Sequence, residues 1–252
     1  MIIDLRIPEH IDIEDVGGKA YNLHKLVRLG IPVPAAIVIP ASVHRQFNQS
    51  DEFTHLLKET LMDHELFSHG SNFAVRSSGV GEDGEANSYA GIFESYLDIP
   101  ADQVFEAVQK VWQSISTRRS KMYSNERSSS VVAMAVVVQK MVSADYAGVA
   151  FSVCPIEKDE RVALIEVVVG LGESLVSGQK TPATFRVNKL TGLARIQRQG
   201  ADNISIDNLE CIAEIITPLV HDIETKYGMP VDVEWAIANW QPYILQARPI
   251  TA

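Results

Sequence analysis

The C-terminal stretch of the chain carries polar side chains that could act together. It reads VDVEWAIANWQPYILQARPIT, and its alternation of apolar and polar residues predicts two β-strands. Residues 239–242 supply the turn between these strands. One face of the predicted hairpin then gathers Asp232, Glu234, Ile244, Gln246 and Arg248.

Two carboxylates, an amide and a guanidinium on one face suit two different roles. Carboxylate and amide oxygens are hard ligands of the kind that Mg²⁺ prefers, and a guanidinium matches phosphate oxygens. Cross-strand ion pairs between Glu and Arg are also frequent on solvated sheet faces. Taken alone, the hairpin is more simply explained by such an ion pair.

Two cations lie upstream in settings that suit an anion. In VGGKAYNL, two glycines free the backbone N–H groups at a predicted helix start, where Lys19 adds a full charge. A capping turn with a solvated lysine is the alternative. Arg76 lies in the middle of the predicted strand NFAVRSS, so it needs an anionic partner. Either a structural carboxylate or a phosphate would serve.

Three further glycine-containing stretches were tested against known phosphate loops. GVGEDG matches the dinucleotide pattern, but no apolar helix follows and its acidic residues would meet the pyrophosphate. GESLVSGQKT has the wrong glycine spacing for a P-loop. SYAGIFES, residues 88–95, is either a loop over phosphates or a simple turn.

The bulk properties exclude several classes of protein. A net charge of −10 over 252 residues argues against binding nucleic acid by neutralising its phosphates. The N-terminus lacks the features of a signal peptide, and the longest apolar run, residues 131–138, is too short to span a membrane. Cys154 and Cys211 fit no metal or redox motif, so we expect buried free thiols in the cytoplasm.

The elements that must position these residues are mixed in type. Helical spacing predicts helices over residues 17–30, 51–66 and 104–115, and over 209–227 with a bend or a new start at Pro218. Val-rich segments predict strands over 72–78, 131–142, 146–153 and 161–172. Helices mixed with mostly adjacent strands predict the α+β class.

Together these pieces resemble a known family. The matching stretches are VGGKAYNL, GIPVP, AVRSSGVGEDGEANSYAGIFESYL, AVVVQKMV, AGVAFSVCP, IEVVVGLGESLVSGQKTP and DVEWAI followed by YILQARPIT. They resemble the nucleotide-binding domain of the phosphoenolpyruvate synthase and pyruvate phosphate dikinase family, which rifampicin phosphotransferases share. The resemblance implies one two-lobed ATP-grasp-like domain over residues 1–252, with ATP in the cleft between its lobes.

The resemblance also assigns roles at the phosphate end of the ATP. Lys19 and Arg76 match the family's cations on the ATP phosphates, and Arg248 matches its catalytic arginine. The Mg²⁺ and phosphate-proximal group corresponds to Asp232, Glu234 and Gln246.

Four further residues match positions that surround the rest of the nucleotide. Gly91 lies in the stretch similar to the loop that closes over the phosphates. Gln139 and Met141 lie in the stretch similar to the strand beside the adenine, whose backbone can pair with the base edge. Glu166 is similar to the acid that contacts the ribose.

The family's phosphohistidine motif, G-G-x-x-S-H-x-A, is missing from this sequence. Ser68 and His69 occur in FSHGSN, but no glycine pair precedes them, so His69 is expected to be an ordinary loop histidine. The resemblance therefore implies a domain that passes a phosphoryl group from ATP to a histidine on a separate domain or protein, giving AMP and phosphate. The alternatives are a stand-alone kinase or ligase that releases ADP, and a non-catalytic ATP-binding module.

Overall fold

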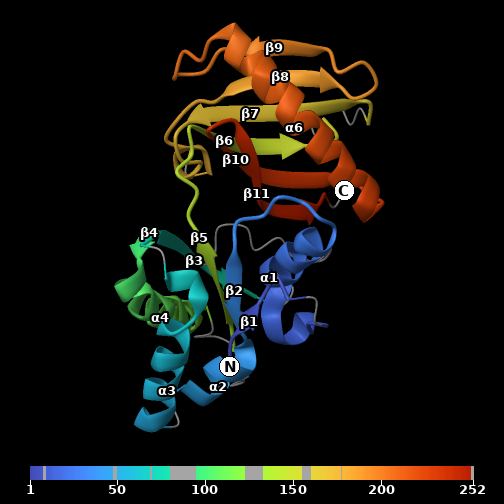
Figure 1. Ribbon diagram of the computed structural model, residues 1–252. Coiled ribbons are helices and arrows are strands. Elements are labelled where there is room, and N and C mark those ends of the chain that lie inside the picture. The colour runs from blue at the N-terminus through green and yellow to red at the C-terminus, as the bar shows by residue number, and fades with distance from the viewer. Residues whose placement is uncertain are drawn as a thin grey trace. The chain divides into compact units, whose positions relative to one another are not determined.

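The chain folds into two compact units. The computed structural model describes residues 1–7, 10–47, 50–68, 70–79, 95–122, 133–154, 160–176 and 178–250. Unit 1 comprises Met1–Lys25 and Pro34–Met141, and unit 2 comprises Leu26–Val33 and Val142–Ala252. Each unit combines helices with one antiparallel sheet, which confirms the predicted α+β class (Figure 1). No helix in the described ranges is both long and apolar enough to cross a membrane.

Unit 1 is built on a five-stranded sheet in the order β1-β2-β5-β3-β4. Its strands are β1 (Ile3–Asp4), β2 (Ala36–Ile39), β3 (Asn72–Ser78), β4 (Ser95–Pro100) and β5 (Ala135–Lys140). Its helices are α1 (Ile13–Arg28), α2 (Ala41–Phe47), α3 (Asp51–Met62) and α4 (Val104–Met122), with 3-10 turns η1 (Glu65–Phe67) and η2 (Ala101–Gln103).

One face of this sheet forms a hydrophobic core with α3 and α4. Leu57 and Leu61 of α3, Val108 of α4, and Phe73 and Val75 of β3 are all fully buried in it. The spacing of the apolar residues in these elements matches the helical and strand periods that predicted them. The strand predicted over 72–78 is β3 in full.

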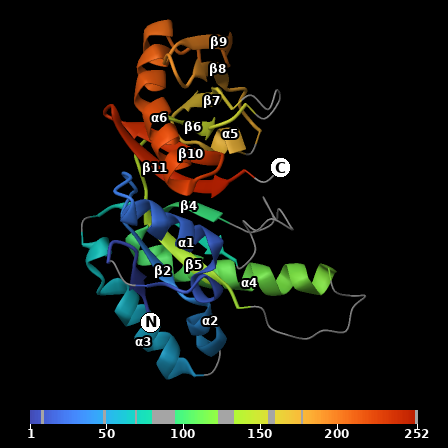
Figure 2. The same cartoon turned by 90° about the vertical axis from the view of Figure 1, so that its right-hand side faces the viewer.

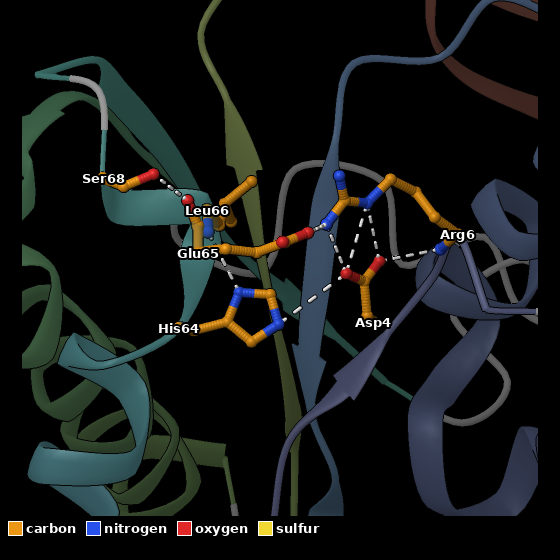
Figure 3. Close-up of polar contacts among 6 residues, drawn as sticks. All are labelled: Asp4, Arg6, His64, Glu65, Leu66 and Ser68. Carbon is orange, nitrogen blue, oxygen red and sulfur yellow. Dashed lines mark hydrogen bonds and ion pairs between the residues drawn. The ribbon is translucent and has the colours of Figure 1, made fainter.

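A cluster of charged residues ties the start of the chain to η1 (Figure 3). Arg6 donates a hydrogen bond of 2.6 Å from one terminal nitrogen to Asp4 and pairs with Glu65. The Nε2 atom of His64 lies 3.7 Å from Oδ2 of Asp4. Burial raises the pKa of Asp4, but its hydrogen bonds from Arg6 outweigh burial and leave that pKa below its usual value.

Helix α1 is bonded to the end of β3 through a glycine kink. Gly17 has a φ of 74°, which interrupts the helical backbone. The N–H of Gly18 donates to Gly79 O (3.0 Å), and the N–H of Ala20 donates to Ser78 Oγ (3.1 Å). A Cβ at position 17 would lie 2.3 Å from the backbone oxygen of Ser78, so only glycine fits. Lys19 therefore lies in a segment whose path β3 fixes.

Unit 2 is built on a six-stranded sheet in the order β11-β10-β6-β7-β8-β9. The strands are β6 (Tyr146–Phe151), β7 (Val162–Val169), β8 (Ala183–Asn188), β9 (Ala194–Arg198), β10 (Val231–Ala238) and β11 (Gln241–Pro249). The helices are α5 (Glu173–Val176) and α6 (Ile206–Tyr227). Figure 2 shows α6 along one face of this sheet and α5 on the side away from α6.

Two expectations for unit 2 are wrong in part. Helix α6 is continuous through Pro218 and does not start afresh there, because Ile216 and Val220 on either side are fully buried and their packing offsets the lost hydrogen bond. Cys154 and Cys211 are both free thiols, but only Cys154 is buried; Cys211 lies on an exposed position of α6.

The closing hairpin also differs from its expected form. The turn consists of Asn239 and Trp240 alone, with φ values of 50° and 59°, which fits a tight two-residue turn. A β-bulge makes Leu245 the extra residue between two register pairs, so Ile244 lies opposite Trp235 and shares its buried face. Ile244 is therefore not on the face of Gln246, contrary to the strict alternation that the sequence predicts.

The kink at Gly17 gives a testable prediction with a matched control. Gly17→Ala should lower the free energy of unfolding by about 3 kcal/mol or more, because the added Cβ collides with the backbone of Ser78. Gly30 has nearly the same φ, 75°, but open space around it. Gly30→Ala should cost only about 1 kcal/mol from backbone strain. Equal losses in urea denaturation would show that the contact with Ser78 does not matter.

Candidate functional site

The register of the unit 2 sheet places four of the candidate residues on one face. Directly opposite residues in antiparallel strands point to the same side of a sheet. Gln246 lies opposite Glu234, which lies opposite Val149 of β6. Val149 in turn lies opposite Glu166 of β7. In the adjacent row of the same face, Arg248 lies opposite Asp232.

The two faces of this sheet differ in burial and polarity. On the face toward α6, Val233, Trp235 and Ile165 are fully buried. On the other face, Asp232, Glu234 and several further polar residues are only partly buried. We call this second side the polar face, defined by Glu166, Asp232, Glu234, Gln246 and Arg248. The sequence predicted that the last four of these residues share a face, and the register confirms it.

Asp232 and Arg248 form the ion pair of the polar face. The Nε atom and one terminal nitrogen of Arg248 donate to the same oxygen, Oδ2 of Asp232, at 2.9 Å and 2.7 Å. The Asp232 side chain is 12% exposed and the Arg248 side chain 37%. The sequence suggested a Glu–Arg pair on a solvated surface, whereas the structure forms an Asp–Arg pair that is half-buried. Such a pair restricts the position of Arg248 while leaving part of its guanidinium accessible.

Gln246 is the most buried polar residue of this face. It is 5% exposed, and its Oε1 atom is buried without a hydrogen-bond partner. Because an unsatisfied buried polar atom costs free energy, such atoms in folded proteins often have a functional ligand. Gln246 lies opposite Glu234, so an amide oxygen and a carboxylate project from adjacent strands.

These oxygens fit Mg²⁺ only if another molecule completes the coordination. Within the described ranges, no three His, Cys, Asp or Glu side chains are grouped so that they could hold a metal ion. Mg²⁺ is commonly held by one or two carboxylates together with the phosphates of a substrate. Asp232, Glu234 and Gln246 supply oxygens of that kind. These oxygens thus fit a Mg²⁺ ion that is also coordinated by the phosphates of a bound nucleotide.

Glu166 lies further along the same face, on β7. Burial raises the pKa of its carboxyl, and the positive charge of Arg198 partly opposes this rise. Thr184 of β8, which is 8% exposed, lies opposite Glu166, and Arg198 of β9 lies opposite Thr184. Thr184 and Arg198 were not predicted from the sequence, because β8 and β9 were not predicted as strands and these two residues match no motif.

The other candidates belong to unit 1. Lys19 and Arg76 are both partly buried, and Lys19 lies between the two residues that bond α1 to the end of β3. Arg76 precedes that end by two residues on β3. On the neighbouring strand, Gln139 is 3% exposed and its Nε2 atom is buried without a hydrogen-bond partner.

The two remaining candidates are Met141 and Gly91. The backbone N–H of Met141 donates to Asn72 O at 2.9 Å, so this N–H is already used within unit 1. Pairing of this strand with an adenine would therefore depend on other backbone groups. Gly91 and most of the stretch 88–95, like His69, lie outside the described residues.

Comparison with known proteins identifies the family of the chain. Residues 62–209 and 201–252 match the family model "Pyruvate phosphate dikinase, AMP/ATP-binding domain". The chain therefore belongs to this family, which confirms the resemblance to its nucleotide-binding domain.

Individual relatives agree with this assignment. The chain is 35% identical to "Uncharacterized phosphotransferase YvkC" of Bacillus subtilis, over 93% of this chain and 33% of that protein. It is 32% identical to a "Probable phosphoenolpyruvate synthase" of Methanocaldococcus jannaschii, over 95% of this chain and 26% of that protein. A "Rifampicin phosphotransferase" of Bacillus subtilis is 26% identical, over 100% of this chain and 36% of its own length. The chain thus spans between 26% and 36% of the length of these relatives.

The unsatisfied oxygen of Gln246 gives a prediction that separates function from stability. Gln246→Leu removes a buried polar group, so the free energy of unfolding should stay level or rise by up to about 1 kcal/mol. The affinity for Mg²⁺-ATP should fall about tenfold, because one ligand oxygen is lost. Gln241→Leu, at the exposed start of β11, is the control and should change neither quantity. A less stable Gln246→Leu variant with unchanged ATP affinity would show a structural role instead.

Proposed function

We propose that this domain binds Mg²⁺-ATP and passes a phosphoryl group to a histidine on a separate domain or protein. ATP would be cleaved twice, the β-phosphoryl would go to the histidine, and AMP and inorganic phosphate would leave. The observation that carries the proposal is the register of unit 2, which gathers Glu166, Asp232, Glu234, Gln246 and Arg248 on one face.

The polar face has the chemistry that phosphoryl transfer requires. This reaction needs little covalent chemistry from the protein; it needs correct positioning and neutralisation of the charge that develops on the phosphates. Asp232, Glu234 and Gln246 would hold Mg²⁺, which neutralises phosphate charge. Arg248 would contribute a guanidinium that its pair with Asp232 keeps in position. Without these cations, the two carboxylates would repel ATP.

Unit 1 would contribute to the same nucleotide with its own residues. Lys19 and Arg76 would bind the phosphates, with Gly91 in the loop over them. The strand that holds Gln139 and Met141 would contact the adenine, and Glu166 of unit 2 would contact the ribose. A cleft between the two units, as in an ATP-grasp-like domain, and a cytoplasmic location belong to this proposal.

The acceptor is the second part of the proposal. The chain spans 26% and 36% of two relatives, which are named as a probable phosphoenolpyruvate synthase and a rifampicin phosphotransferase. Because this sequence lacks the phosphohistidine motif, we propose that the histidine lies outside it. Direct phosphorylation or ligation of a small molecule would give ADP, and a non-catalytic module would bind ATP without turnover.

The nucleotide product distinguishes these functions. The full natural polypeptide, incubated with Mg²⁺-ATP and with candidate histidine-bearing partners, should release AMP and phosphate and label the histidine from [β-³²P]ATP. Release of ADP alone would overturn the dikinase reaction and favour a kinase or ligase. ATP binding without any turnover would favour the non-catalytic module.

A variant of Arg248 tests the site in the same assay. Arg248→Ala should abolish AMP release, and the loss of its pair with Asp232 should lower the free energy of unfolding by only about 1–2 kcal/mol. Arg195→Ala, on exposed strand β9, is the matched control and should retain full turnover. Normal AMP release by Arg248→Ala would show that this arginine is not catalytic.

A further inference from the structure

A second β-bulge, on the edge strand β9 of the unit 2 sheet, changes the face on which an arginine lies. Ile196 of β9 pairs with Phe185, and Arg198 pairs with Thr184, which leaves Gln197 as the extra residue. Residues two apart in a regular strand share a face. Because of the bulge, Ile196 and Arg198 point to opposite faces of the sheet. Ile196 shares the face of the buried Phe185, and Arg198 lies on the polar face.

This placement puts Arg198 in the row of Glu166. The row runs from Glu166 to Thr184 to Arg198 across three adjacent strands, so two strand spacings of about 4.8 Å separate the backbones of the end residues. The residue between them is a small threonine, and the side chains of arginine and glutamate are long. Their charges interact, since Arg198 lowers the pKa of Glu166 against the effect of burial.

Other charged residues surround Glu166 on the elements that pack against β7. Arg186 of β8 lies on the same face, diagonal to Glu166. Glu234 lies in the same row, beyond Val149 of β6, and Glu173 belongs to α5, which packs against β7. Like charges favour the protonated form of a carboxyl and cations oppose it, and Arg198 is the cation that lowers the pKa of Glu166. Because Arg198 is in the row itself, it is the group to test first.

We infer that Arg198 is a positioning residue for nucleotide recognition: it holds Glu166 as the carboxylate that accepts hydrogen bonds from the ribose hydroxyls. This inference rests on the proposed ATP site. A carboxylate offers two acceptor oxygens to a pair of hydroxyls, whereas a protonated carboxyl has turned one oxygen into a donor. Burial favours the protonated form of this carboxyl, and the nearby cation Arg198 favours the charged form.

The test is the pH dependence of ATP binding to the full natural polypeptide, measured by calorimetry between pH 5.5 and pH 8. Arg198→Gln removes the charge, and Arg198→Lys retains it. Arg195→Gln, three residues away on the same strand and opposite Arg186, is the matched control for general loss of positive charge. Protonation of the ATP phosphates changes the measured affinity equally for all variants. Comparing the variants at the same pH therefore removes this effect.

We expect a change in the pH dependence of ATP affinity that depends on Glu166. Arg198→Gln should bind ATP like the wild type, within about twofold, at pH 8 and about tenfold more weakly at pH 5.5, because loss of the cation favours the protonated Glu166 carboxyl as the pH falls. Arg198→Lys should restore most of the binding at pH 5.5. In a Glu166→Gln background, Arg198→Gln should add no further effect. With 2′,3′-dideoxy-ATP, which lacks both hydroxyls, Arg198→Gln should match the wild type at every pH.

Several outcomes would overturn the inference and leave the proposed function intact. One is ATP binding by Arg198→Gln that matches the wild type at every pH. Another is an equal loss in Arg195→Gln, which would indicate a general charge effect. A loss that persists with 2′,3′-dideoxy-ATP or in the Glu166→Gln background would show that Arg198 acts elsewhere. Failure of the wild type to bind ATP would instead overturn the proposed function.

Discussion

The strand register of unit 2 is the constraint on which its candidate site depends. A slip of one residue in an antiparallel pair would move Glu166 or Glu234 from the polar face to the face covered by α6. Gly148 of β6 helps to fix this register. A Cβ at that position would meet the backbone oxygen of Glu166 at 1.9 Å and the ring of Trp235 at 2.6 Å. Because Gly148 has no side chain, β6 can approach β7 closely beside Glu166, a residue of the candidate site.

Two β-bulges change the faces on which individual side chains lie, compared with a regular register. On β11, the bulge at Leu245 returns Ile244 to the core while Gln246 and Arg248 stay on the polar face. On β9, the bulge at Gln197 moves Arg198 to the polar face. Both are local departures from period two, and bulges of this kind are frequent beside functional sites because they redirect one side chain without disturbing the rest of the sheet.

The sequence predicted the regular parts of this structure and missed the irregular ones. Strand β3 and the alternation of β10 were predictable, because burial on one face imposes a period of two on their apolar residues. The bulge at Leu245 and the unbroken path of α6 through Pro218 were not, since both depend on packing against distant residues. Strand β9 carries mostly exposed residues, so it lacks the apolar pattern by which a strand is recognised, and Arg198 was missed with it.

Motif resemblance and the structure supply different information about the candidate residues. Motif resemblance named Asp232, Glu234, Gln246 and Arg248, but it did not show that Asp232 and Arg248 pair or that Gln246 has an unsatisfied buried oxygen. The unsatisfied oxygen of Gln246 carries a cost in stability, and a folded protein retains such a cost where binding compensates for it. A solvated surface pair would need neither the burial of Gln246 nor the restraint on Arg248. The burial of Gln246 therefore supports the nucleotide and metal site that we propose for the polar face of unit 2.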